Sequence, residues 1–186
     1  MKKVFFSALA TLFVLNLSAQ KFFTKDAKVN FDATSALEKI AAVNSKGTLA
    51  IDAATGKIEA AVLVKGFHFE QALMEEHFNE NYMESNKFQK STFAGDIVDF
   101  KNAVNLAKDG SYTAAVKGKL TMHGVTNDVE TKGTFTVKGG AISASKTSFK
   151  ILVADYGIAI PGIVRNKIAK EAKIDISATM QALKTK

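Results

Sequence analysis

The 186-residue chain contains no cysteine and no tryptophan, only one proline (Pro161) and only one arginine (Arg165). Without cysteine, neither a disulfide nor a lipid-modified cysteine can form. The chain is therefore compatible with an oxidising compartment but gains no disulfide from it. No low-complexity segment, internal repeat or linker divides the chain. Its length is that of one domain with a sizeable buried core.

Basic residues exceed acidic ones, 25 against 18, for a net charge of +7. All but Arg165 are lysines, and they are spread along the chain. Arginine supplies the forked contacts that most often recognise phosphate and guanine. The sequence therefore predicts a solvated basic surface and no nucleic-acid partner.

Motifs of catalysis and of metal binding are also missing. The chain has no Gly-x-Ser-x-Gly elbow, no phosphate-binding loop and no dinucleotide fingerprint. No two of its histidines, His68, His77 and His123, are three to five residues apart, whereas zinc sites show such spacing. Glu76, Glu80 and Glu84 are predicted to form a solvated row on a helix. We expect no enzyme, no metal site and no cofactor.

The N-terminus has the pattern of an export signal. Lys2 and Lys3 precede an apolar stretch at 4–15, and Leu17-Ser18-Ala19 forms a cleavage site. The stretch is too short to span a bilayer comfortably, and no stop-transfer pattern follows. We predict a cleaved signal peptide at 1–19 and a single domain at 20–186 that is periplasmic or secreted and does not span the membrane. Losing the two lysines leaves 23 basic and 18 acidic residues, a net charge of +5.

Alternation of apolar and polar residues dominates the rest of the chain. Between 112 and 122 one side of an extended strand carries Tyr112, Ala114, Val116, Gly118, Leu120 and Met122. A period of two indicates a half-buried antiparallel strand. Because Ala114 and Gly118 are small, the inner side of a curved sheet leaves room there for something other than side chains.

Further short strands follow from the same pattern and from turn residues such as Asp109-Gly110, His123-Gly124 and Gly139-Gly140. They are predicted at 29–31, 40–44, 48–52, 57–65, 91–100, 111–122, 129–137, 142–153 and 173–182. This count of about eight or nine evenly spaced strands favours a sandwich or an up-and-down barrel. Residues 163–169 are predicted to form a short helical turn.

Residues 70–84 change to helical spacing. Leu73, Met74, His77, Phe78 and Tyr82 occupy one face, and glutamates with Asn79 occupy the other. This predicts an amphipathic helix with a wet acidic side. Phe67 and Phe69 precede it, and Phe88 and Phe93 follow it. The same cluster is typical of an ordinary core lid and of a pocket, and the pattern alone does not choose between them.

Four segments resemble the YceI-like polyisoprenoid-binding family. Residues 119–126, Lys-Leu-Thr-Met-His-Gly-Val-Thr, resemble the family signature Leu-Thr-Ile-His-Gly-Val-Thr. Residues 30–35 are similar to its opening strand, 76–95 to its helix, tyrosine segment and next strand, and 155–161 to its late loop. The resemblance covers nearly all of the mature chain. Gln89 and Asp128 depart from the family pattern, each at a position where proline is expected.

The resemblance implies a mainly β fold: an extended, antiparallel, eight-stranded lipocalin-like barrel with one amphipathic helix and a short late helical turn. It implies a non-covalent ligand, an isoprenoid or another long-chain lipid or amide, in an internal apolar tunnel. The tunnel-lining candidates are Phe67, Phe69, Leu73, Phe78, Tyr82, Phe88, Phe93, Ile97, Tyr112, Val116, Leu120, Met122, Phe135, Phe149, Ile151 and Tyr156. Ala60, Gly95, Ala114, Gly118, Gly133 and Ala178 are predicted to keep the lumen open or to relieve strand curvature.

Some alternatives stay open. Arg165 and His123 are the head-group candidates, with Lys167 and Tyr156 as further options, although Arg165 also has the character of an ordinary surface residue. A protein-interaction module would expose Leu73, Phe78 and Tyr82 as one apolar patch. An enzyme acting inside the barrel would need a polar cluster there, and Tyr112 is the only obvious inward polar group. A homodimer is also open.

Overall fold

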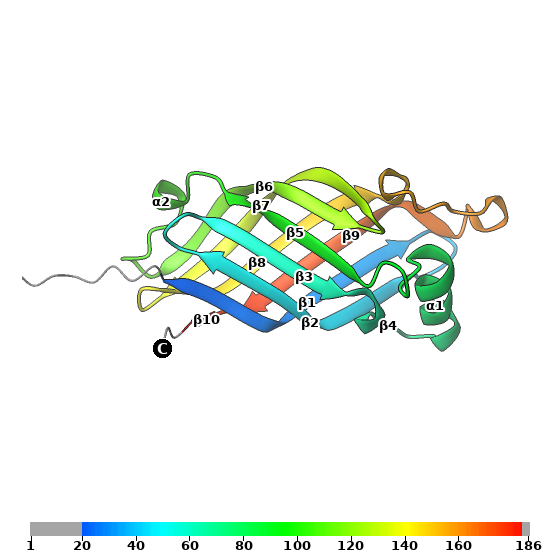
Figure 1. Ribbon diagram of the computed structural model, residues 1–186, viewed down its shortest axis with the longest axis horizontal. Coiled ribbons are helices and arrows are strands. Elements are labelled where there is room, and N and C mark those ends of the chain that lie inside the picture. The colour runs from blue at the N-terminus through cyan, green and yellow to red at the C-terminus, as the bar shows by residue number, and fades with distance from the viewer. Residues whose placement is uncertain (1–19, 184–186) are drawn as a thin grey trace, which may run out of the picture.

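Antiparallel pairing closes eight strands into a barrel in the computed structural model, which describes residues 20–183 (Figure 1). The barrel strands are β1 (Lys21–Thr34), β2 (Ala41–Asp52), β3 (Lys57–Leu63), β5 (Lys90–Ile97), β6 (Gly110–Met122), β7 (Val125–Lys138), β8 (Ala141–Leu152) and β9 (Ile168–Thr179). Two short strands, β4 (His68–Phe69) and β10 (Gln181–Ala182), extend the edges of β2 and β1. The predicted eight-stranded antiparallel barrel is confirmed. The predicted signal peptide lies outside the described residues.

Closure comes from β1, which pairs with β2 on one side and with β9 on the other. Phe31, for example, is opposite both Ala42 and Ile174. Apart from the pair β9 and β1, neighbouring barrel strands follow one another along the chain. The topology is therefore up-and-down. A closed barrel leaves no free edge of any length.

The first two strands are longer than the sequence predicted. β1 begins at Lys21 instead of residue 29, because Phe22 is fully buried. The separate strands predicted at 40–44 and 48–52 form one strand, β2. Its register against β1 shifts near Gly47, where an added Cβ would lie 2.9 Å from the Ala27 carbonyl oxygen. Gly47, which lies just before the strand predicted at 48–52, is therefore a bend within a continuous strand.

The predicted helix at 70–84 is shorter and irregular. α1 spans Ala72–His77, and a π-helical turn, η2, continues it over Phe78–Tyr82. Glu75, predicted on the wet face, instead is half-buried, and its carboxylate accepts the backbone N–H of Phe69 at 3.1 Å. This bond ties α1 to the chain that precedes it.

Other short helical turns lie at the barrel ends: η1 (Val64–Gly66), α2 (Phe100–Ala103), η3 (Val153–Tyr156) and η4 (Gly162–Val164). α2 was missed, because the alternation at 91–100 predicted strand to Phe100, whereas β5 ends at Ile97. Asp99, between them, has a left-handed backbone with a φ of 51°. The helical turn predicted at 163–169 is shortened to η4, since β9 begins at Ile168.

Two hydrophobic cores divide the barrel along its axis. α1 and α2 lie at opposite ends of the barrel (Figure 1). At the α2 end Phe100 and Val104 pack into a core with inward residues of the strands, among them Phe22, Ile51 and Ile142. A second core surrounds Phe78 at the α1 end. The α2 end is thus closed by side chains, and the question of an internal space concerns the α1 end.

Candidate functional site

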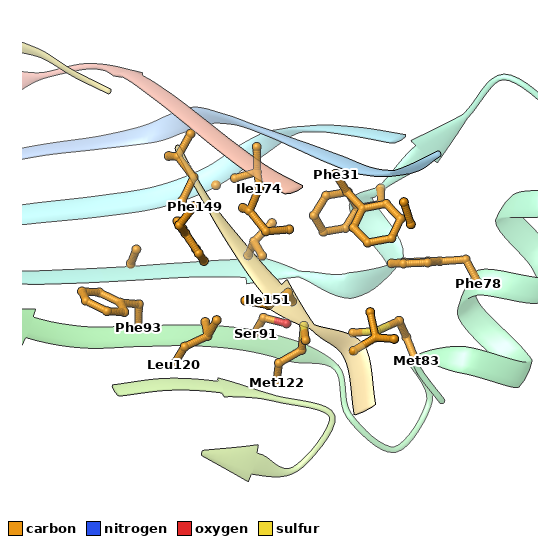
Figure 2. Close-up of a pocket in the computed structure, with 18 of the residues that line it drawn as sticks. Phe31, Phe78, Met83, Ser91, Phe93, Leu120, Met122, Phe149, Ile151 and Ile174 are labelled. Atoms are coloured by element: carbon orange, nitrogen blue, oxygen red, sulfur yellow. The ribbon is translucent and has the colours of Figure 1, made fainter. Parts of the chain in front are cut away.

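A cavity of about 430 Å³ extends from the α1 end into the barrel, as far as Val116 and Phe135, which also belong to the core at the α2 end. Its wall is formed by inward residues of the strands, by α1 and η2, and by the loop between β8 and β9. Figure 2 shows carbon-rich side chains directed into this space from several strands, with the Ser91 hydroxyl among them. The volume falls in the range of about 300–1,000 Å³ that is typical of ligand pockets.

Four phenylalanine rings line the cavity where α1 covers it. Phe78, only 8% exposed, lies among the rings of Phe31, Phe67 and Phe69. The ring centroids of these three are 5.5, 5.7 and 5.0 Å from that of Phe78. Tilted and edge-on contacts at such distances are favourable aromatic arrangements. Through Phe78, the segment at the end of α1 is fixed to the barrel.

Most predicted lining residues lie on the cavity wall. They are Phe67, Phe69, Leu73, Phe78, Tyr82, Phe93, Val116, Leu120, Met122, Phe135, Phe149 and Ile151. Sequence reasoning missed several more: Phe31, Met83, Ile158, Ile160, Ile168, Ile174 and Ile176. Phe31, Ile174 and Ile176 belonged to predicted alternating strands, so their inward side was available as a signal. Contact of any of these residues with a ligand stays a prediction.

Four predicted lining residues lie elsewhere. Ile97 belongs to the closed core at the α2 end. Tyr112 also lies toward that end, and its hydroxyl donates to the Lys108 carbonyl at 2.7 Å. Phe88 packs edge-on against the His123 ring at 4.6 Å, outside the cavity. Tyr156 is buried as the last residue of η3, the turn that follows β8.

The inward glycines do not leave empty space. An added Cβ on Gly118 would lie 2.6 Å from the Phe93 ring and 2.4 Å from the Ala94 carbonyl oxygen. A Cβ on its cross-strand partner Gly95 would meet the Gly118 Cα at 2.7 Å. These glycines therefore let β5 and β6 approach closely and let Phe93 lie across the sheet, which is the curvature role. Ala114 and Ala178 lie in the closed core, whereas Ala60 and Gly133 do line the cavity.

Neither of the two head-group candidates, Arg165 and His123, lies on the cavity wall. Arg165 is exposed on the loop after η4. His123 occupies the β6–β7 turn with a φ of 52°, and its Nδ1 is 3.1 Å from the Tyr156 carbonyl oxygen. Because a carbonyl only accepts, Nδ1 carries the proton. The His123 Nε2 is 3.7 Å from Glu84. This histidine connects two loops and does not face the cavity.

Lys167 does line the cavity, and its ammonium is 3.6 Å from the carboxylate of Glu38, which is also on the wall. Both side chains are partly solvent-exposed. They mark a polar edge where the cavity reaches water. The sequence offered Lys167 as an option, but its pairing with a residue near the other end of the chain required the fold.

Deeper in the cavity, hydroxyl groups supply the polarity. Thr131 and Thr147 line it on neighbouring strands, and each donates its hydroxyl to a backbone carbonyl across the β7–β8 boundary, at 3.1 and 3.0 Å. Ser91 and Ser145 add two further hydroxyls to the wall. Burial raises the pKa of Tyr82, so its phenol stays neutral to a higher pH than that of an exposed tyrosine.

Charged groups able to form a metal centre are not gathered in residues 20–183, where no three His, Cys, Asp or Glu side chains cluster suitably. None of the helices in that range has the length and apolar character needed to cross a bilayer.

These features define the class of protein: an antiparallel up-and-down β-barrel with one apolar cavity covered by a short helix. The model of the YceI-like domain matches residues 17–180. The chain therefore belongs to the YceI-like family, which confirms the resemblance seen in its motifs. Comparison with curated protein sequences gave no match.

Solved structures share the fold at low identity. A polyisoprenoid-binding domain from Saccharophagus degradans, implicated in plant cell wall breakdown, has a TM-score of 0.72 at 15% identity, over 89% of this chain and 99% of that one. BcnA of Burkholderia cenocepacia gives 0.64 at 16% identity, over 82% and 96%. A YceI protein of Campylobacter jejuni gives 0.54 at 15%, over 75% and 81%.

Proposed function

We propose that this protein binds an isoprenoid or another long-chain amphiphilic lipid in its cavity, and sequesters or carries it without catalysis. The observation that supports this most is an apolar, phenylalanine-lined cavity within a barrel whose other end is closed by side chains. The polyisoprenoid-binding domain that shares the fold adds support for the ligand class.

Burial of a long apolar tail against this wall can supply the binding free energy of such a ligand. Each methylene moved from water into the cavity contributes about 0.8 kcal/mol. Ten buried methylenes give about 8 kcal/mol before the cost of immobilising the ligand is subtracted. Burial of the tail alone is therefore sufficient for substantial affinity, and the head group is left to set orientation.

The polar groups of the wall suit binding better than catalysis. The Thr131 and Thr147 hydroxyls donate to strand carbonyls, so they are available to a ligand only as acceptors. No base lies within hydrogen-bond distance of them in the described residues that could activate a nucleophile. They can orient a hydroxyl or amide group of a ligand.

We place the mature protein in the periplasm or outside the cell. The support is the sequence of residues 1–19, with its basic start, short apolar stretch and small residues before Gln20. An isoprenoid or lipid carrier is needed where such molecules must cross an aqueous space.

The alternative of an interaction module using the α1 region has less support. It requires Leu73, Phe78 and Tyr82 to be exposed together, but Phe78 is buried and Tyr82 is half-buried. Only Leu73 of the three is exposed, so the predicted patch does not form.

Mass spectrometry of solvent extracts tests the proposal. The mature protein is purified from its native compartment without detergent, extracted with organic solvent, and compared with an equal amount of an unrelated exported protein. Enrichment of one or a few long-chain species at near-stoichiometric amounts is expected. If nothing apolar is recovered, and delipidated protein also fails to take up prenyl alcohols, fatty amides or fatty acids, the proposal is wrong.

A further inference from the structure

Among residues 20–183 eight large hydrophobic side chains are exposed, and they are not equally so. Ile163, Leu37 and Leu73 are 93%, 71% and 61% exposed, whereas the other five range from 36% to 53%. Single exposed aliphatic residues are ordinary on protein surfaces. The location of these three is not ordinary, because each belongs to a segment that contributes to the open end of the cavity.

Those three segments form what we call the rim: the β1–β2 connection (35–40), α1 with the two residues before it (70–77), and the loop before β9 (157–167). In the sequence, Glu38 follows Leu37 and Val164 follows Ile163. Glu38, Val164 and Leu73 itself all line the cavity. Figure 1 shows the three segments at the same end of the barrel.

Two ion pairs hold the rim together. Lys167 and Glu38, 3.6 Å apart, link the loop before β9 to the β1–β2 connection. Lys39 and Glu70, 3.2 Å apart, link that connection to the start of α1. The exposed aliphatic side chains are therefore carried on segments that contact one another around one opening, although they are far apart in the sequence.

We propose that the rim docks on the surface of a phospholipid bilayer, with Ile163, Leu37 and Leu73 inserted among the lipids, so that the apolar ligand passes between bilayer and cavity without crossing water. This inference rests on the proposed function for its biological meaning. The apolar wall of the cavity reaches the rim at Leu73, and a bilayer is the partner that continues an apolar surface into an apolar reservoir.

Charge on the rim is mixed. Arg165, Lys167 and Lys39 are basic, whereas Glu38, Glu70 and Glu76 are acidic. Docking should therefore depend on apolar insertion more than on anionic lipid, and vesicles of zwitterionic phosphatidylcholine are the appropriate probe.

The absence of tryptophan allows a direct test. Ile163→Trp places a single indole on the rim, and Leu183→Trp places one at a residue that is 46% exposed near β10, at the opposite end of the barrel. With phosphatidylcholine vesicles, the emission of Ile163→Trp is expected to shift to the blue and to be quenched by brominated lipid. Leu183→Trp is expected to show neither change.

A second variant measures the contribution of the rim without altering the cavity wall, since neither Leu37 nor Ile163 lines it. The double variant Leu37→Ser/Ile163→Ser is expected to lose vesicle binding in a flotation assay by about a hundredfold, since burial of each aliphatic side chain contributes a factor of about ten or more. Its thermal unfolding and its uptake of a fluorescent long-chain alcohol from solution are expected to match the unmodified protein.

The outcomes are distinguishable. Unchanged Ile163→Trp emission with vesicles overturns bilayer docking, even if lipid extraction supports the proposed function. A blue shift that appears without vesicles and grows with protein concentration also overturns it, since a second copy then covers the rim. A vesicle-dependent shift in a protein that yields no lipid on extraction, and that takes up no long-chain alcohol, amide or acid after delipidation, supports docking and refutes the proposed function.

Discussion

Ala60→Phe is the substitution that most directly tests whether the cavity is the binding site. Ala60 lies on β3, faces the cavity, and is opposite Leu49 on β2 and Phe93 on β5. A phenyl ring at this position takes space that a ligand tail would otherwise occupy. Ala50→Phe is the matched control, because Ala50 is exposed on the outer side of β2.

The ring displaces about three to four methylenes, each contributing about 0.8 kcal/mol on burial. The loss of binding free energy is therefore about 3 kcal/mol, which corresponds to roughly a hundredfold weaker affinity. Ala50→Phe should leave affinity unchanged within about twofold, since surface substitutions have effects within about 0.5 kcal/mol.

Titration of delipidated protein with a fluorescent long-chain alcohol measures both affinities, and near-UV circular dichroism establishes that each variant is folded. If Ala60→Phe is folded and binds the alcohol as tightly as Ala50→Phe, the ligand does not occupy this part of the barrel. The reasoning from cavity to function is then refuted.

Three further predictions concern the segments around the cavity. Phe78→Ala should lower the free energy of unfolding by about 3–5 kcal/mol, because it removes a buried ring that contacts three others; a loss below about 1 kcal/mol in chemical denaturation would contradict this packing. Burial raises the pKa of Tyr82 above its ordinary value of 10.0, so the stability due to its neutral phenol is complete below about pH 10 and is lost as pH rises further. Tyr82→Phe should therefore unfold less steeply with alkaline pH, and an unaltered profile would count against that burial. Gly124→Ala should cost about 1–2 kcal/mol, since φ is +76° and the new Cβ would lie 2.5 Å from the Phe88 ring; thermal unfolding checks this, with Gly162→Ala, where a Cβ has open space, as control.

Local pattern was sufficient to predict the strands and the inward side of most of them. The alternation from Tyr112 to Met122 predicted one side of β6 correctly because the side-chain period of a strand is fixed by backbone geometry. The sequence predictions are wrong where tertiary contacts override the local pattern. The two strands predicted at 40–44 and 48–52 are one strand that bends at Gly47. The Glu75 carboxylate, predicted to face water, accepts a backbone N–H of the preceding segment instead.

The inward side of a strand is not the same as the cavity wall. Ile97 and Leu120 both face inward on adjacent strands, yet Ile97 is in the closed core and Leu120 lines the cavity. The difference depends on position along the barrel axis, since α2 brings Phe100 and Val104 into one end. α2 was not predicted, so the sequence had no means of showing where the closed core stops.

The sequence by itself determined the strand period, the family and the apolar character of the interior, because each follows from residue type and spacing along the chain. Only the tertiary structure decided which inward residues enclose a space, which glycines hold strands close, and which lysine lies beside the opening. Those properties depend on the stagger of the strands and on contacts between distant segments, such as Lys167 with Glu38, and neither is encoded in any local window of sequence.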